Sequence, residues 1–148
     1  MGMERSKNSI LIKGILILAL ALMAYMGFSL RSAQISNRDL PDSRPSGPTS
    51  AIVDTAHILD DIKSSTAKQL ALIKEDYAIE AMVVTLPSLP PSHTIESLAA
   101  EIFSNWQIGG TTGGRGLLLL LSNKEKLVKI EVSYELEDVF TDIFCGYI

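Results

Sequence analysis

The sequence has little of the chemistry on which most hydrolases and metalloproteins depend. It contains one cysteine, Cys145, and two histidines, His57 and His93. A single cysteine excludes an intrachain disulfide, and neither histidine has a partner at metal-ligand spacing. No G-x-S-x-G motif is present, and the sequence alone positions no histidine against a nucleophile, so it predicts no catalytic triad. We therefore expect both histidines to be surface or capping groups.

Positive charge is scarce in the larger part of the chain. From Ala51 onward there are fourteen Asp and Glu residues against seven Lys and Arg, which gives a net charge of −7. Proteins that bind the phosphate backbone of nucleic acids need clustered lysines and arginines. The composition therefore excludes a nucleic-acid partner and favours cations or basic surfaces.

A long hydrophobic run is present only near the N-terminus. Three basic residues precede an apolar stretch of 17 residues at 14–30, which is close to the lower limit for crossing a bilayer. Residues 1–31 are predicted to be a membrane anchor, with a cleaved signal peptide as the alternative. In either case the positive-inside rule places everything after Arg31 outside the cytoplasm, in the periplasm or the extracellular space.

Residues 32–50 are rich in proline, serine, asparagine and aspartate. Such a segment buries too little apolar surface to offset its ordering entropy, so it is predicted to be a flexible linker. The folded domain is expected to cover residues 51–148.

Hydrophobic periodicity predicts alternating helices and strands within this domain. Asp60 and Thr94 are the expected N-caps of two helices, and a third helix is expected to start between Glu135 and Asp138. Residues 117–121 and 127–133 are predicted to pair as an antiparallel hairpin, because only a short polar link separates them. The pattern indicates an α/β fold with a mixed sheet. The expected segments are helices at 61–77 and 95–106 and strands at 51–53, 81–86, 117–121 and 127–133.

A glycine-rich loop spans residues 109–116. Its backbone amides and Arg115 offer donors for an anion such as phosphate, although a plain crossover between a helix and a strand explains the same composition. It matches neither the P-loop nor the dinucleotide-binding pattern.

Several segments together resemble the TPM domain family, over nearly all of residues 51–148. The segments that carry the resemblance are Ile52-Val53-Asp54 with Ile58-Leu59, Met82–Thr85, Phe103–Gly109, Gly116–Leu121, Lys129–Val132, Leu136-Glu137 and Thr141-Asp142. The resemblance implies a three-layer α/β/α sandwich that is exported and tethered to a membrane. It also implies bound divalent metal, often calcium, and an acid phosphatase activity that is attributed to a plant member.

The sequence departs from the family pattern at three places. The family usually has Gly-Tyr-Gly where this chain has Ser133 and Glu135 around Tyr134. Arg115 stands where many members have smaller residues, and the family domain continues for another helix or more beyond the point where Ile148 ends. We therefore expect a domain that is truncated at its C-terminal end.

Acidic residues provide the candidate site. Asp54 follows the first expected strand, and further acidic residues surround the start of the last helix. If these segments pack together, Asp54, Glu137 and Asp142 converge as ligands of Ca²⁺ or another divalent cation, which takes 6 to 8 oxygens. A solvated acidic face is the alternative.

Two functions fit these expectations. The favoured one is an extracytoplasmic, membrane-tethered module that helps to assemble or maintain membrane protein complexes. The alternative is a metal-assisted acid phosphatase, in which Asp54 and Asp142 hold the cation and Arg115 steadies the phosphate. The candidate catalytic residues are therefore Asp54, Arg115 and Asp142.

Overall fold

The computed structural model describes residues 44–46 and 51–140. Its elements, in chain order, are β1 (Ile52–Asp54), α2 (Lys63–Tyr77), β2 (Glu80–Leu86), α3 (Ile95–Asn105), β3 (Gly116–Ser122), β4 (Leu127–Val132) and a short 3₁₀ helix, η1 (Tyr134–Leu136). Within this described part, no helix has the length and apolarity needed to cross a bilayer. The predicted anchor at 1–31 lies outside the described residues.

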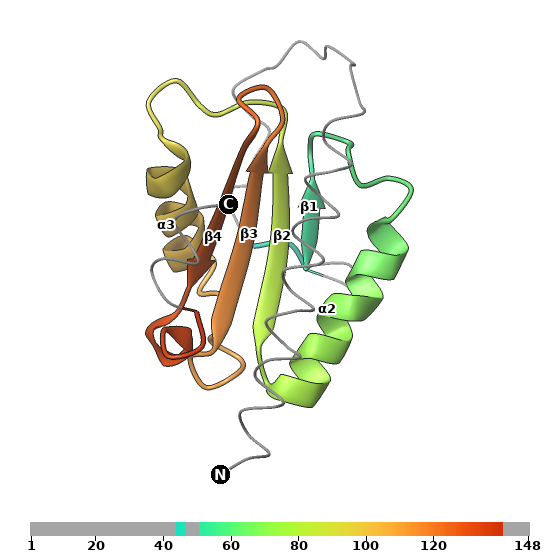
Figure 1. Cartoon of the computed structure of the whole chain (residues 1–148), viewed down its shortest axis with the longest axis vertical. Helices are drawn as coiled ribbons and strands as arrows, with labels where there is room; N and C mark the ends of the chain where they lie inside the picture. The colour runs from blue at the N-terminus through green and yellow to red at the C-terminus, as the bar shows by residue number, and fades with distance from the viewer. Residues whose placement is uncertain (1–43, 47–50, 141–148) are drawn as a thin grey trace.

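Four strands form one mixed sheet in the order β1-β2-β3-β4 (Figure 1). The strands β1, β2 and β3 run parallel, and β4 returns antiparallel to β3. The α/β class, the mixed sheet and the β3–β4 hairpin are therefore confirmed. The register aligns Glu80 with Gly116 and Leu117 with Val132, so the amino ends of the parallel strands and the carboxyl end of β4 share one end of the sheet.

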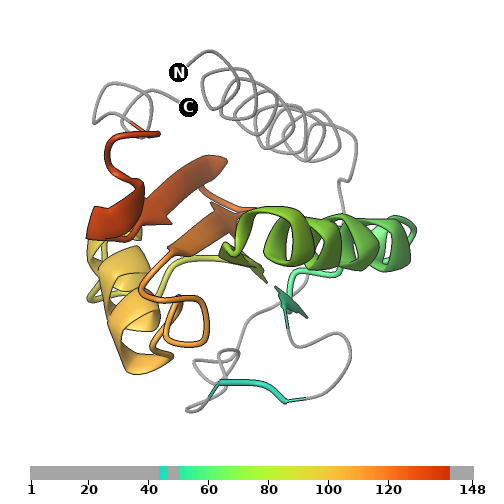
Figure 2. The same cartoon turned by 90° about the horizontal axis from the view of Figure 1, so that it is seen from below.

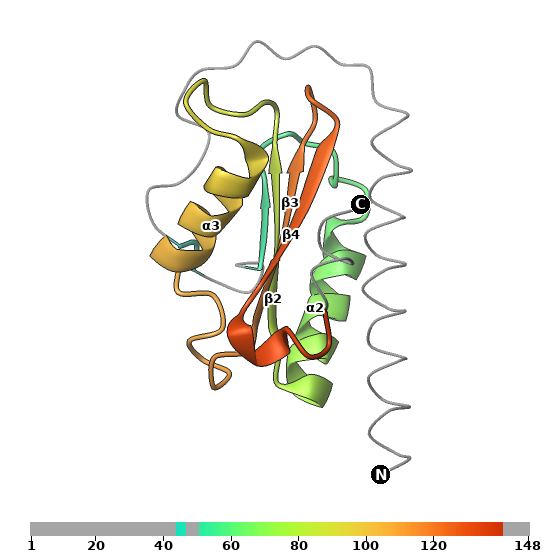
Figure 3. The same ribbon diagram turned by 60° about the vertical axis from the view of Figure 1, so that its left-hand side comes forward.

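Each face of the sheet has its own apolar core. Alternate side chains of β2 and β3 point to opposite faces, so that Val83 and Leu119 join one core while Val84 and Leu120 join the other. Helix α2 packs on the first core through Leu70. Helix α3 packs on the second, so the helices lie on opposite sides of the sheet (Figures 2 and 3).

The two helix starts differ from each other. Thr94 caps α3 as expected: its hydroxyl accepts a hydrogen bond from the Ser97 N–H, and the Ser97 hydroxyl completes a capping box. The prediction of Asp60 as the cap of α2 is wrong, because the chain is still in a turn there and Ile62 N–H donates to the Leu59 carbonyl at 2.9 Å. Ile62 occupies the N-cap position and makes no side-chain cap bond.

The segment after β4 was expected to begin a helix. As far as residue 140 it forms only the 3₁₀ turn of η1, whose last residue, Leu136, joins Phe140 in the core on the α2 face of the sheet. Both side chains are at most 1% exposed. The rest of the expected helix, residues 141–148, lies outside the described range.

Candidate functional site

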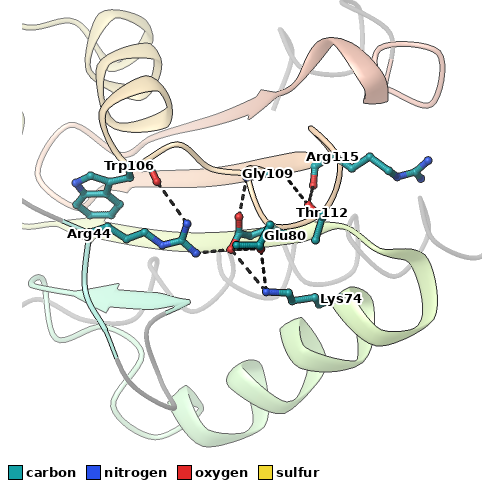
Figure 4. A network of polar contacts seen from close by, with 8 residues as sticks. Arg44, Lys74, Glu80, Trp106, Gly109, Thr112 and Arg115 are labelled. Atoms are coloured by element: carbon teal, nitrogen blue, oxygen red, sulfur yellow. Dashed lines mark hydrogen bonds and ion pairs between the residues drawn. The ribbon is translucent and has the colours of Figure 1, made fainter.

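The first residue of β2 is a buried glutamate. The side chain of Glu80 is 5% exposed and lies beside the loop that links α3 to β3 (Figure 4). Its Oε2 accepts a hydrogen bond from the Gly109 N–H at 2.7 Å, and its Oε1 accepts one from the Thr111 hydroxyl at 3.2 Å. A buried carboxylate is stable only when donors replace its lost hydration, and this loop supplies two of them.

Two cations from distant parts of the chain also approach Glu80. Arg44, which belongs to the predicted linker, donates from Nη2 to Glu80 Oε1, and its Nη1 donates to the Trp106 carbonyl at 3.4 Å. Lys74, on α2, places its Nζ 3.8 Å from the same Oε1 and donates to the Thr111 hydroxyl at 3.1 Å. The network thus joins a segment before the domain to both helices and to β2 (Figure 4).

These contacts set the ionisation of Glu80. Burial acts to raise the pKa of its carboxyl, but the hydrogen bonds from Arg44 and Gly109 and the positive charge of Arg44 outweigh it. The net result is a pKa below the ordinary value of 4.5. Glu80 is therefore ionised at neutral pH and acts as a fixed negative charge rather than as an acid or a base.

The glycine-rich loop holds an anion, and that anion is the chain's own Glu80 carboxylate. The loop is tight: Gly109 has φ +96°, and a Cβ there would lie 2.7 Å from Gly116 N. The Gly109 carbonyl accepts hydrogen bonds from the N–H groups of Thr112 and Gly114. The loop is therefore a folded turn with its own hydrogen bonds, and its Gly109 amide is already used.

Arg115 is not aimed at this network. Its carbonyl accepts hydrogen bonds from the Glu80 N–H and the Thr112 hydroxyl, whereas its guanidinium points away from Glu80 (Figure 4). The Nε of Arg115 is buried and has no hydrogen-bond partner. Its predicted role in steadying a phosphate remains a prediction, because nothing in the described contacts tests it.

Asp54 is also buried, at 8% exposure. Its Oδ1 accepts hydrogen bonds from the Ile58 N–H and from the Thr85 hydroxyl, and its Oδ2 accepts one from the Leu59 N–H at 2.9 Å. Both oxygens therefore hold the loop that follows β1, and Oδ1 also joins β1 to Thr85 of β2. In this structure Asp54 organises a turn, and the sequence pattern gave no indication of that role.

The structure does not bring Asp54 and Glu137 together. Asp54 ends β1 at the carboxyl end of the parallel strands, whereas β4 runs the other way and delivers Glu137, just after η1, to the opposite end (Figure 1). Asp142 lies outside the described residues. Over 44–46 and 51–140, no three His, Cys, Asp or Glu side chains are grouped so as to hold a metal ion. The predicted metal set stays a prediction.

His93 does lie beside a serine, which the sequence did not predict. Its Nδ1 is 3.0 Å from the Ser92 hydroxyl, and its Nε2 is 2.9 Å from Glu101 Oε2. All of these contacts are on the surface, and they tie the loop before α3 to the body of that helix. His57 is more exposed and lies 3.7 Å from Asp60, so both histidines are at the surface, as expected.

Comparison with known proteins identifies the family. A family model described as the TPM domain matches residues 52–148. The chain belongs to the TPM domain family. No curated protein matches it.

This TPM domain accommodates its unusual residues around Tyr134 with specific contacts. The hydroxyl of Ser133 accepts a hydrogen bond from the Gly116 N–H at 3.0 Å. The carboxylate of Glu135 lies over Gly114, where a Cβ would come within 3.0 Å of both of its oxygens. The two side chains therefore pack on the glycine-rich loop, and Gly114 is small enough to let Glu135 approach.

Sequence reasoning missed the two central residues of this TPM domain's polar network. Glu80 is a single charge at the head of an apolar strand, a position that usually marks the point where a strand meets solvent. Arg44 lies 36 residues earlier in a proline-rich segment. One feature of the sequence could have indicated that Glu80 is buried: it directly precedes the apolar run 81–86, with no turn residue between them.

Proposed function

We propose that this TPM domain works outside the cytoplasm as a membrane-tethered binding module that helps to assemble or maintain membrane protein complexes. The N-terminal sequence supports the membrane part of the proposal. Its apolar run at 14–30 follows three basic residues, and this charge distribution favours export of everything after it. A reporter enzyme fused after Ile148 is expected to be active only on the outer side of the membrane.

One observation favours a binding module over a phosphatase. Asp54, the residue proposed to hold a catalytic cation, uses both carboxylate oxygens to accept hydrogen bonds from its own loop and from Thr85. Three of the roughly four acceptor sites of this carboxylate are therefore occupied, which leaves only one, on Oδ2, for a cation. The carboxylate is better explained by folding than by catalysis.

The exposed surface offers a place for a partner. Tyr134 is 80% exposed, and the acidic residues Glu135, Glu137 and Asp138 beside it are exposed as well. An exposed aromatic side chain among carboxylates suits a basic protein surface, because aromatic residues are enriched at binding hot spots and opposite charge steers association. We propose that this segment contacts a basic region of a membrane protein complex.

Hydrolysis of a phosphomonoester separates the two functions. The full chain, purified in detergent, is assayed with and without Ca²⁺, alongside Asp54→Asn and Arg115→Ala. A binding module gives no hydrolysis that depends on these residues. Metal-dependent hydrolysis that falls in both variants would establish the phosphatase instead.

A thermal shift tests the proposed cation. A ligand that binds only the native state raises the melting temperature. A rise with Ca²⁺ that is lost in Asp54→Asn supports a cation bound at Asp54. Absence of a rise removes the cation from the proposal and leaves the binding module standing.

A further inference from the structure

The Arg44 side chain occupies a built site. One of its terminal nitrogens bonds to the carboxylate of Glu80, which is 5% exposed, and the other bonds to the Trp106 carbonyl. The two acceptors come from different elements, because Glu80 begins β2 and Trp106 is the C-cap of α3. The Arg44 side chain itself is 32% exposed, so it is largely enclosed although it comes from a segment outside the matched domain.

The chemistry of this site suits a guanidinium group better than an ammonium group. A guanidinium is a planar fork whose nitrogens reach two separate acceptors at once, and it is always charged. The carboxyl end of α3 adds a preference for a cation, because its last carbonyls carry the negative end of the helix dipole. Lys74 shows the contrast, since its ammonium stays 3.8 Å from Glu80 and donates to Thr111 instead.

We propose that Glu80 and the Trp106 carbonyl form a guanidinium-binding site whose ligand is Arg44, and that this contact clamps residues 44–46 to the sheet. The folded unit then begins at Arg44 rather than at Ala51. The clamp lies at the end of the sheet where the parallel strands start, because Glu80 aligns there with Gly116. This proposal does not depend on the membrane function.

Spin labelling tests the clamp directly. Ser46 is exposed and lies two residues after Arg44, and Cys145 is the only cysteine. A nitroxide is attached after Ser46→Cys in the full-length Cys145→Ser chain, and its mobility is measured by electron paramagnetic resonance. With Arg44 present the label is restrained by the backbone, and in Arg44→Ala or Glu80→Gln its correlation time shortens several-fold. A label placed at the exposed Leu72 of α2 is the matched control and keeps its spectrum in both variants.

Chemical rescue tests the guanidinium chemistry. Arg44→Ala lowers the melting temperature, followed by fluorescence of the single tryptophan, by roughly 5–10 °C, because Glu80 loses its main charge partner. Methylguanidinium at millimolar concentration recovers most of this loss, while methylammonium at the same concentration does not. The added ion fills the site without reconnecting the chain, so the label at position 46 stays mobile.

Three results would overturn the proposal. The first is an unchanged label at position 46 in Arg44→Ala, which would mean that Arg44 does not hold the segment. The second is equal rescue by methylammonium, which would mean that the site recognises only charge. The third is a decrease in melting temperature by Arg44→Ala that is as large in a Glu80→Gln background as in the original chain. The double-mutant cycle would then show no coupling between the two residues.

Discussion

A carboxylate that leaves water must be surrounded by donors, and Glu80 shows how many a single residue can collect. It accepts from a backbone amide, a hydroxyl and a guanidinium, and an ammonium lies nearby. Two of these donors come from the loop 109–116, and the two cations come from the segment before β1 and from α2. The buried Glu80 carboxylate is therefore stabilised only by tertiary contacts, and it is satisfied only when the folded structure has formed.

The lowered pKa of Glu80 predicts a pH dependence of stability. Because its folded pKa lies below its ordinary value of 4.5, its contribution is present above that value and is lost as the pH falls through the folded pKa. We expect Glu80→Gln to lower the free energy of unfolding by about 1–3 kcal/mol at pH 7. Urea denaturation of both proteins from pH 7 to pH 3 should show this difference shrink on acidification. A difference that stays constant with pH would contradict the assignment.

Asp54→Asn is predicted to destabilise the domain even without metal. The carboxamide replaces one accepting oxygen with a donor that faces the N–H groups of Ile58 and Leu59 or the Thr85 hydroxyl. Leaving buried donors unpaired costs about 1–3 kcal/mol, which urea denaturation in the presence of a chelator can measure. Unchanged stability would show that the turn does not depend on Asp54.

At the scale of elements, α2 carries a built-in weakness at its end. Its C-cap, Ala78, has φ +51° and ψ +42°, a left-handed conformation in which a Cβ costs about 1 kcal/mol. Ala78→Gly is therefore expected to raise the melting temperature by a few degrees. Ala71→Gly, at an exposed position in the middle of the same helix, is the matched control. It should lower the melting temperature, because glycine there only increases the backbone entropy of the unfolded chain.

The start of α3 supports the opposite kind of prediction. Thr94→Ala removes the hydroxyl that accepts from the Ser97 N–H, and such a loss costs about 1 kcal/mol. Thr94→Ser keeps the oxygen and should keep most of the stability. Thermal unfolding of the two variants tests this, and equal losses in both would indicate that the methyl group matters more than the cap.

Elements were predictable from sequence to the extent that local periodicity encodes them. The 3.6-residue spacing of Ile95, Leu98 and Ile102 places α3, and the alternation of Val128 and Ile130 places β4. The N-cap of α2 was missed because Asp60 is a good cap by residue type, while the turn geometry that excludes it depends on how residues 55–59 fold against Asp54. Arg44 and Glu80 were missed because no local pattern pairs residues across a tertiary contact.

At the scale of the whole molecule, the position of Arg44 would limit how far the domain can move from a membrane in which residues 1–31 are anchored, as proposed above. Thirteen residues separate the end of the apolar run at Leu30 from Arg44, and even fully extended they reach at most about 45 Å. Without the clamp, twenty residues separate Leu30 from Ala51, and the maximum extended length rises to about 70 Å. We therefore expect the end of the sheet that carries Glu80 and Tyr134 to face the proposed anchor.

This arrangement predicts an orientation that can be measured in vesicles. Leu127 and Tyr134 are both exposed and mark opposite ends of β4: Leu127 is its first residue, and Tyr134 lies just beyond its last. In a Trp106→Phe background, a tryptophan introduced by Tyr134→Trp is expected to be quenched more strongly by headgroup-attached nitroxide lipids than one introduced by Leu127→Trp. Equal quenching in chains that float with the vesicles would refute the orientation, while failure to float would refute membrane attachment.

The clamp also changes how the domain bears mechanical load. The chain enters the sheet through β1, an edge strand of three residues that pairs only with β2 among the described strands, and a pull applied at Ala51 would unzip it one hydrogen bond at a time. A pull that arrives through Arg44 reaches the Arg44–Glu80 pair first, and so it loads the amino end of β2, which is hydrogen-bonded in the sheet along its whole length to β3. A moving partner or a fluctuating bilayer would therefore apply its force to a central strand of the sheet, and the short edge strand β1 would bear little of it.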